Sequence, residues 1–507
     1  MIAPLLLLTL AQAPAFDLPE TAGLAGAPLE LAGSGFGTAG AASFLEVRSG
    51  AASFRLASTA PQVLEWRDDR IRIALPADAR SGEISLHAPG GATPFLRVDV
   101  FEYSWYDIPP TPGTNASPLA ITVGPDHRVW VNQEFHLEFQ MLDPAVGAVV
   151  GLPIPKPVDP GPFASTIFSD RRTQMSSLGE DILVDPRGRV WFTQGGGYLY
   201  SGLHPNHSRV VCFDPAAPAG SEYKVYNAPG DWNEVIGLAW DQARGRMWVT
   251  NGGLSSGAKI ASFDPERAPW SNHFAFNVSI NHHACAPGAP TDDCWQVYAL
   301  PNPTAQPAHL LAHPSGDVWY TAYWGNAIGR LEPETGVIEE YPLPPAIGTS
   351  DPVWVVGSGP WQILLGPNDD IVFNEFFDST LGRFRISRLG DPACLRLNAQ
   401  GRNPCIEEIV VPEVDLKHHQ LHSIAFDPEG RLWFTQHTSG DQLDSTVSLG
   451  FVTADGAAIV LLPSLAGFDP DDAPSAAGIA IDPVTHDVWF AEFWRQRIGR
   501  LRWLAPR

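Results

Sequence analysis

The sequence predicts an all-β protein in which a seven-bladed β-propeller follows a small β-sandwich. Three observations carry this prediction. A strand–turn–strand pattern recurs seven times over most of the chain, and a segment with a different pattern precedes the first copy. Of the 507 residues, 44% are hydrophobic, which supplies the apolar surface that a large core needs. Helix should therefore be scarce.

The repeat consists of an apolar strand, a turn containing Asp, Pro or Gly, and a second apolar strand that opens on an aromatic residue. Its copies span 121–131, 182–192, 238–249, 310–320, 363–373, 424–434 and 479–490. Their equivalent positions hold Trp130, Trp191, Trp248, Trp319, Val372, Trp433 and Trp489. The spacing exceeds the roughly 40–50 residues of common propeller repeats, so we expect inserted loops.

The turn and the tryptophan each have a physical role in the predicted blade. A D-P-x-G turn reverses the chain tightly enough to join two short antiparallel strands. The tryptophan is bulky enough to act as a wedge between neighbouring sheets. The fullest copy continues through two more strands over 326–344. Each blade is therefore expected to have four strands.

The two ends of the ring are predicted to meet in one blade. After 498–501 the chain reaches Arg507 without the outer strand that the fourth copy has at 340–344. A matching segment, 103–109, lies just before the first copy. We expect it to complete the last blade, because closure removes an exposed sheet edge. The propeller is assigned to residues 102–507.

Residues 16–101 lack the repeat and consist of short alternating segments, which are typical of an immunoglobulin-like β-sandwich. The segments 29–37 (LELAGSGFG), 63–66 (VLEW), 71–76 (IRIALP) and 81–84 (SGEI) resemble the IPT/TIG immunoglobulin-like domain. In that family the module usually serves as a spacer or an adhesive unit. The resemblance implies no chemistry for this segment.

The first fifteen residues are interpreted as a signal peptide for export. An apolar run, 5–10, precedes two Ala-x-Ala patterns at 11–13 and 13–15. No other stretch approaches the roughly 18–20 uninterrupted apolar residues of a membrane span. We therefore predict a secreted or periplasmic protein.

The charge excludes two classes of partner. The chain has 56 acidic against 32 basic residues and a formal net charge of −24. Such a surface repels a phosphate backbone and an anionic lipid surface, both of which are bound through Lys and Arg clusters. No nucleic-acid or membrane-surface role is expected.

The five cysteines fit an oxidising compartment if four of them pair locally. Cys285 with Cys294 and Cys394 with Cys405 bracket two polar, turn-rich loops. Cys212 is left over in an alternating segment, where we expect a buried thiol rather than a nucleophile.

The strand endings W-F-T-Q and W-F-A-E, with I-G-R-L following in the fourth and seventh copies, resemble the virginiamycin B lyase (streptogramin lyase) family of seven-bladed propellers. The resemblance spans roughly residues 103–503. It implies an enzyme that opens a cyclic depsipeptide by elimination, a carbon–oxygen lyase. It also implies a magnesium ion held near His and Glu residues at the central channel. An elimination needs a base beside a carbonyl and a group that stabilises the developing enolate charge.

Residues just past the aromatic strand and just before each repeat are expected to converge on the propeller axis. The first register holds Gln133, Gln194, Asn251, Ala322, Glu375, Gln436 and Glu492. Glu375 and Glu492 are the predicted metal carboxylates, because a buried carboxylate is costly without a cation or several donors. A one-residue bulge would align Glu134 with them, and Glu134-Phe135-His136 matches the acidic-x-His pattern of the lyase family.

Four histidines are the predicted catalytic residues. His437 follows Gln436 directly and His136 belongs to the acidic-x-His pattern, so either can serve as the base. On the entering side, His309 precedes the fourth repeat and His422 the sixth, with Gln362 equivalent in the fifth. His309 and His422 are expected to complete a polar ring.

Two alternatives remain open. In the first, the carboxamides only tie blades together through backbone hydrogen bonds, and Glu375 and Glu492 pair with Arg383 or Arg497. In the second, the chain is a non-catalytic binding protein whose propeller face holds a glycan or a protein partner. That reading predicts an open platform of aromatic side chains, formed by residues such as Tyr323, Trp324, Phe377 and Trp494. A monomer is expected in either case.

Overall fold

The structure is a computed structural model. It describes residues 13–109, 117–133, 138–154, 181–194, 209–228, 235–252, 257–268, 270, 295–345, 357–412, 419–438, 448–462 and 476–506. These residues form β-strands and short 3-10 turns, and none of them lies in an α-helix, so the all-β prediction is confirmed. Within the same ranges, no helix is long and apolar enough to cross a membrane.

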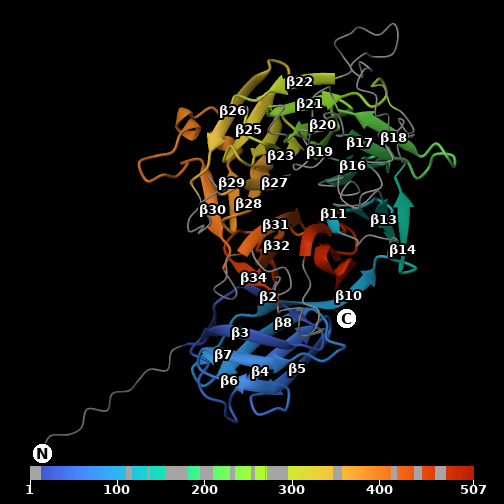
Figure 1. Ribbon diagram of the computed structural model, residues 1–507. Helices are drawn as coiled ribbons and strands as arrows, with labels where there is room; N and C mark the ends of the chain where they lie inside the picture. Colours follow the sequence, from blue (N-terminus) through green and yellow to red (C-terminus); the bar gives the residue numbers. More distant parts are fainter. Residues whose placement is uncertain are drawn as a thin grey trace, which may run out of the picture.

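Six four-stranded antiparallel sheets stand around a common centre (Figure 1). In each sheet the strands follow chain order from an inner strand near the centre to an outer strand at the rim. The first sheet comprises β11 (Pro118–Val123), β12 (Val129–Gln133), β13 (Glu138–Asp143) and β14 (Ala148–Pro153). The second comprises β15 (Ile182–Val184), β16 (Val190–Gln194), β17 (Arg209–Phe213) and β18 (Tyr223–Asn227). The third comprises β19 (Val235–Asp241), β20 (Arg246–Asn251), β21 (Lys259–Phe263) and β22 (Trp295–Ala299). The fourth sheet comprises β23 (Pro307–Ala312), β24 (Val318–Ala322), β25 (Ala327–Glu332) and β26 (Val337–Pro342). The fifth comprises β27 (Pro360–Leu365), β28 (Ile371–Glu375), β29 (Thr380–Phe384) and β30 (Ile406–Val410). The sixth comprises β31 (His419–Phe426), β32 (Leu432–Thr438), β33 (Ser448–Val452) and β34 (Ile459–Leu461).

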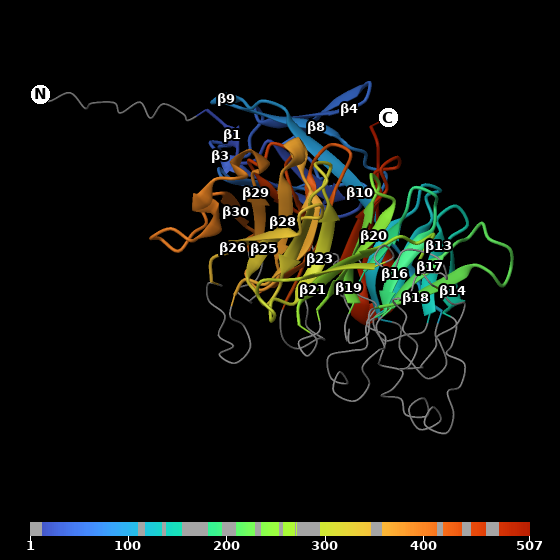
Figure 2. The ribbon, with the colours of Figure 1, turned by 90° about the horizontal axis from the view of Figure 1, so that it is seen from above.

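A further run of four strands has the same antiparallel order but belongs to a nine-stranded sheet. The run consists of β35 (Ala476–Ile481), β36 (Val488–Glu492), β37 (Arg497–Trp503) and β10 (Leu96–Asp107). Here β10 pairs with β37 from Phe101 opposite Trp503 to Asp107 opposite Arg497. The first half of β10 pairs instead with strands of the N-terminal unit (Figure 2). The predicted boundary between residues 101 and 102 therefore falls inside a continuous strand.

The N-terminal unit consists of two packed sheets. One continues from β10 through β8 (Gly82–Ala88), β4 (Phe44–Ser49) and β5 (Ala52–Ala57), with β2 (Glu20–Leu24) and β9 (Gly91–Ala92) at its sides. The other orders β1 (Ala15–Phe16), β3 (Pro28–Ser34), β7 (Arg70–Ala74) and β6 (Val63–Trp66). Leu504 lies in the core between them, and its N–H donates to the Val100 carbonyl oxygen at 2.9 Å. The C-terminal end of the ring is thus packed into the N-terminal unit.

The repeated D-P-x-G turn holds its strands through the aspartate. The Oδ1 atom of Asp185 accepts the backbone N–H groups of Arg187 at 2.9 Å and Arg189 at 3.0 Å. Its Oδ2 atom accepts Arg189 Nε at 2.7 Å and Trp191 Nε1 at 2.9 Å. Gly188 has a φ of 80°, which the turn requires and which glycine adopts without strain. One carboxylate therefore fixes the turn, the arginine and the tryptophan together.

The repeated aromatic residues separate neighbouring sheets, as the wedge prediction states. Trp191 is fully buried and packs with Val235, Leu238 and Met247 of the following sheet. The equivalent residues are also buried between adjacent sheets, namely Trp130, Trp248, Trp319, Val372, Trp433 and Trp489.

A buried network of charges joins the N-terminal unit to the ring. Arg431, on the turn between β31 and β32, is 4% exposed. Its Nε donates to Asp427 Oδ2 at 2.6 Å, and its Nη1 donates to Asp99 Oδ2 of β10. Arg97 of β10 reaches back to Glu429 at 2.6 Å. The two units are held together by the buried Arg431–Asp99 pair and the partly exposed Arg97–Glu429 pair, in addition to the shared strand.

Candidate functional site

The inner strands surround a cavity of about 60 Å³ at the centre of the ring. Its lining comes from β11, β15, β23, β27, β31 and β35, which surround the centre of the ring. The lining residues are Leu119, Ala120, Ile121, Asp181, Ile182, His309, Trp361, Gln362, His422, Ser423, Gly478 and Ile479. The structure therefore brings together the three residues predicted for the entering side, His309, Gln362 and His422.

Side chains of the second strands hold the inner strands in place. Thr321 of β24 accepts the N–H of His309 at 3.0 Å and donates to the carbonyl oxygen of Trp361 in the next sheet at 2.6 Å. The same bridge from one sheet to the next is made by Thr250, Asn374 and Thr435. These bonds fix the positions of the cavity residues.

Glycine allows two of the inner strands to approach their neighbours closely. A Cβ atom on Gly237 would lie 2.3 Å from the Ala308 carbonyl oxygen, next to His309. A Cβ atom on Gly478 would lie 2.4 Å from the Leu119 carbonyl oxygen. Any larger residue at either position would push a backbone away from the centre.

A histidine and an aspartate from different sheets meet at the cavity. His309 is 8% exposed, and its Nδ1 lies 3.4 Å from Asp181 Oδ2. Asp181 is held by two backbone donors, the N–H of Leu238 on Oδ2 at 2.8 Å and its neighbour's N–H on Oδ1 at 2.9 Å. The other nitrogen of His309, Nε2, is buried and has no hydrogen-bond partner among the described residues. Such an atom can accept a proton or a hydrogen bond from a ligand.

Partly buried aromatic side chains cluster beside the cavity, and we call them the aromatic platform: Tyr323, Trp324, Trp361, Phe376 and Phe377. Tyr323 is central, with ring centroids 5.2 Å from Trp361 and 5.5 Å from Phe377. The platform contacts both histidines. The ring centroids of His309 and Trp361 are 5.2 Å apart, and those of His422 and Phe376 are 5.8 Å apart.

Two short connections orient the platform. The N–H of Tyr323 donates to the Gln306 carbonyl oxygen at 3.1 Å, directly after β24. After β28, Phe376 and Phe377 donate their N–H groups to the carbonyl oxygens of Gly359 and Ser358, both at 2.9 Å. The Tyr323, Trp324 and Phe377 part of the predicted platform is therefore assembled. The side chain of Trp494 lies outside the described residues.

Glu375 is buried at the end of β28, with 1% of its surface exposed. Burial raises the pKa of this carboxyl to about 8, although the Ser358 hydroxyl hydrogen-bonds it and lowers the pKa. Glu408 and Asp378, both acidic, raise the pKa further. The alternative pairing with Arg383 is wrong, because Arg383 donates to Asp370 at 2.7 Å. The buried position therefore favours the protonated form of Glu375.

Glu492 is fully buried at the equivalent position of β36 and is held by the outer strands of its sheet. Its Oε1 accepts the Tyr103 hydroxyl of β10 at 2.8 Å, and its Oε2 lies 3.4 Å from Arg497 Nε. The predicted pairing with Arg497 is therefore confirmed. The carboxylate lies over Gly499 of β37, where a Cβ atom would approach Oε1 to 2.8 Å.

Of the predicted metal carboxylates, Glu375 and Glu492 do not line the central cavity and belong to no group of possible metal ligands among the described residues. Magnesium needs ionised carboxylate oxygens and room for several waters. Glu375 is buried beside the Ser358 hydroxyl, and Glu492 contacts Arg497 and the Tyr103 hydroxyl of the outer strands. Glu134 and His136 lie outside the described residues, and so does the side chain of His437, whose backbone belongs to β32. A magnesium site stays a prediction from the resemblance alone.

The register past the aromatic strand does not line the described cavity. Its members are buried, but their side chains contact the sheets themselves. Gln194 accepts Arg209 Nε at 3.2 Å, Asn251 donates to the Gly257 carbonyl oxygen at 3.1 Å, and Gln133 accepts the Ser117 N–H at 3.1 Å. All three bonds lie within single sheets, so they do not show the predicted ties between blades.

Asp181 and Trp361 are site residues that sequence reasoning missed. Asp181 directly precedes the second repeat, the same position that His309 and Gln362 occupy in theirs. That register was a usable signal. The equivalent residue in the sixth repeat is Ser423, and His422 lies one residue earlier. Trp361 had no such signal, because it precedes the register by one residue.

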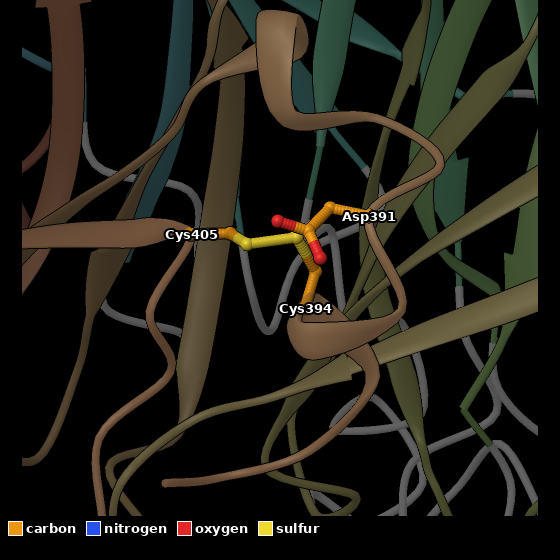
Figure 3. A group of neighbouring side chains, drawn as sticks. All are labelled: Asp391, Cys394 and Cys405. Carbon is orange, nitrogen blue, oxygen red and sulfur yellow. A yellow bond between two sulfur atoms is a disulfide. The ribbon is translucent and has the colours of Figure 1, made fainter.

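A group of Asp391, Cys394 and Cys405 has metal-ligand atoms within 4.8 Å of one another (Figure 3). The two sulfur atoms form a disulfide, as the spacing predicts, so they are not thiolate ligands. Asp391 caps the short turn Pro392–Leu395 through the Ala393 N–H at 2.9 Å and binds Arg388 at 2.6 Å. These contacts give the group a structural role in the segment between β29 and β30. Cys285 and Cys294 lie outside the described residues.

Breaking this disulfide should destabilise the fifth sheet. Replacing Cys394 and Cys405 with alanine is expected to lower the free energy of unfolding by about 2–4 kcal/mol, because the lobe between β29 and β30 loses its cross-link. Chemical denaturation of the variant and the parent under oxidising conditions measures the difference. Reduction of the parent should lower its midpoint by a similar amount, and equal midpoints for all three samples would contradict the prediction.

Cys212 is the free cysteine of the described residues, and it is buried. Burial raises the pKa of its thiol to about 12, so no thiolate is present at neutral pH. The prediction of a buried thiol rather than a nucleophile is confirmed.

Comparisons with known proteins bear on the fold. No family model matches the sequence, and a search of curated proteins found no similar chain. Among solved structures, a streptogramin B lyase is similar with a TM-score of 0.50 and 20% identity, covering 80% of this chain and 98% of its own. Virginiamycin B lyase from Staphylococcus aureus gives a TM-score of 0.50 and 19% identity, covering 79% and 99%. The fold is propeller-like.

A third similar structure is a catalytically inactive variant of the Staphylococcus aureus virginiamycin B lyase with quinupristin. It has a TM-score of 0.50 and 20% identity, and it covers 79% of this chain and 99% of its own. At these identities the likeness concerns the fold of the propeller-like part.

Proposed function

We propose that the mouth of the central cavity binds a small molecule that presents apolar or aromatic rings. The aromatic platform is the observation that carries this proposal. Five partly buried aromatic residues from two neighbouring sheets gather beside a cavity that also contains two histidines. Aromatic walls with a few polar groups are typical of small-molecule sites, and ring stacking adds to the energy of burial.

The proposal includes the architecture around this mouth. The six sheets and the β35–β36–β37–β10 run would be seven blades, preceded by an immunoglobulin-like unit of the IPT/TIG type at about residues 16–101. The chain would be exported to the periplasm or the medium and act as a monomer. The Cys394–Cys405 disulfide supports export, because such bonds persist in oxidising compartments. A glycan or a protein partner is the alternative occupant of the platform.

Quinupristin, which the similar lyase structure contains, is a suitable probe for the platform. Replacing Phe377 with alanine is expected to weaken its binding about tenfold or more, since buried aromatic contacts dominate such sites. Isothermal titration calorimetry measures the dissociation constant. Phe54→Ala is the matched control, because Phe54 is 56% exposed on β5 of the N-terminal unit. No binding by the parent, or equal binding by Phe377→Ala, would reject the platform for this ligand.

Elimination on an ester is a second candidate function, favoured by the His309–Asp181 pair. Nε2 of His309 would take the proton from the carbon beside a carbonyl, the electron pair would form a C=C bond, and the C–O bond would break to release a carboxylate. Asp181 would stabilise the resulting imidazolium. Ring opening by elimination leaves the mass of a cyclic ester unchanged, whereas hydrolysis adds one water. Mass spectrometry of quinupristin after incubation therefore distinguishes elimination, hydrolysis and simple binding.

A further inference from the structure

We infer that the ligand of this mouth carries an O–H or N–H donor beside its ring, and that His309 accepts this hydrogen bond through Nε2. The inference rests on the proposed aromatic platform and adds the polar half of the ligand.

The position of the proton on His309 follows from Asp181. A carboxylate only accepts hydrogen bonds, so the imidazole nitrogen beside it is the one that carries hydrogen. Nδ1 is that nitrogen, at 3.4 Å from Asp181 Oδ2. Asp181 is fixed by the N–H groups of Leu238 and Ile182, so it cannot turn away without losing them. Nε2 is left with its lone pair.

A buried acceptor without a hydrogen-bond donor is rare in proteins. Nε2 is buried and has no partner among the described residues, although His309 itself lines the cavity. The side-chain amide oxygen of the neighbouring Gln362 accepts the Ser423 hydroxyl at 2.9 Å and the Ile424 N–H at 2.7 Å, which fixes the orientation of this side chain beside His309. Buried acceptors are normally satisfied, so a bound donor is the missing partner.

The size of the cavity determines which part of the ligand can enter it. A volume of about 60 Å³ holds a few water molecules, so it suits a polar group better than a whole ring. A hydroxyl or an amide N–H can enter, while the attached ring stays on the platform, where Trp361 contacts His309 edge to face. The geometry therefore selects rings that carry a donor over rings of the same size that lack one.

Phenol and anisole test this selection, because they share a ring and differ in the O–H donor. Ligand-detected saturation-transfer NMR on the full chain is expected to show phenol binding about tenfold tighter than anisole. His309→Leu should abolish the difference, and His309→Gln, whose amide oxygen is an acceptor, should restore part of it. In ¹⁵N-histidine spectra of the parent, the His309 signal should report an unprotonated Nε2 that shifts when phenol is added.

The outcomes separate this inference from the proposed function. Binding of neither ring would overturn the platform and this inference together. Equal binding of phenol and anisole would overturn this inference alone, as would a proton on Nε2 in the free protein. The ¹⁵N signal that is absent from both His309 variants is the His309 signal. If one variant unfolds, the other variant still provides the comparison.

Discussion

Replacing Arg431 with leucine is expected to lower the free energy of unfolding by about 3–5 kcal/mol. The arginine is 4% exposed and lies between Asp427 of its own turn and Asp99 of β10. Its removal would leave Asp427 buried without its cation, and Asp99 would keep only Arg97, whose side chain is 40% exposed. Trp433 and Trp503, which donate to the same two carboxylates at 3.0 and 3.2 Å, cannot neutralise them. Urea denaturation followed by far-ultraviolet circular dichroism measures the loss.

An exposed ion pair serves as the control for this variant. Arg385 pairs with Glu407 at 2.7 Å, with side chains 46% and 52% exposed. Arg385→Leu is expected to change the free energy of unfolding by less than about 1 kcal/mol, because water screens surface pairs. Similar losses in Arg431→Leu and Arg385→Leu would show that the buried network does not join the two units as described.

Glu375 is expected to make the protein less stable as the pH rises from about 4.5 to 8. In the folded protein burial raises the pKa of this carboxyl to about 8, whereas the ordinary value for a glutamate carboxyl is 4.5. Between these values the folded state holds one proton more than the unfolded state, so the free energy of unfolding falls with pH, by at most about 1.4 kcal/mol per pH unit. The full contribution is present below the unfolded pKa and is lost as pH passes the folded pKa.

Glu375→Gln removes this dependence, because the amide is neutral at every pH and nearly the same size. The variant should match the parent near pH 4.5 and exceed it near pH 8 by a few kcal/mol. Thermal and urea denaturation at both pH values measure the difference. Glu30→Gln, at an exposed carboxylate of the N-terminal unit, is the control and should follow the parent. A Glu375→Gln variant that follows the parent over this range would show that Glu375 is ionised in the fold.

Phe376 and Phe377 directly follow Glu375, so this carboxyl also bears on the platform. Ser358 contacts Glu375 with its hydroxyl and Phe377 with its carbonyl oxygen. A change in the charge of Glu375 would therefore act next to the backbone that positions Phe377.

The amino-acid sequence by itself determined the repeat and its chemistry. The D-P-x-G turn requires an aspartate that accepts backbone N–H groups, a glycine at positive φ and a bulky aromatic residue, and these are local requirements. The spacing of Cys394 and Cys405 likewise suffices for a disulfide. Such features depend on residues a few positions apart, so they can be read along the chain.

The tertiary structure alone decided which polar residues meet. Alternation along a strand tells which side chains share a face, but it does not tell what lies opposite that face. The register of Glu375 and Glu492 was therefore identified correctly as buried, yet Glu492 turns to Tyr103 and Arg497 rather than to the axis.

The pairing of Asp181 with His309 shows the same limit. The two residues are separated by a whole sheet in the chain, and they meet because the inner strands close around a common centre. The continuity of β10 across the predicted boundary has a similar cause, since one extended strand can satisfy a sheet on each half of its length. Contacts between distant segments follow from the closure of the ring, and closure is a property of the assembled sheets.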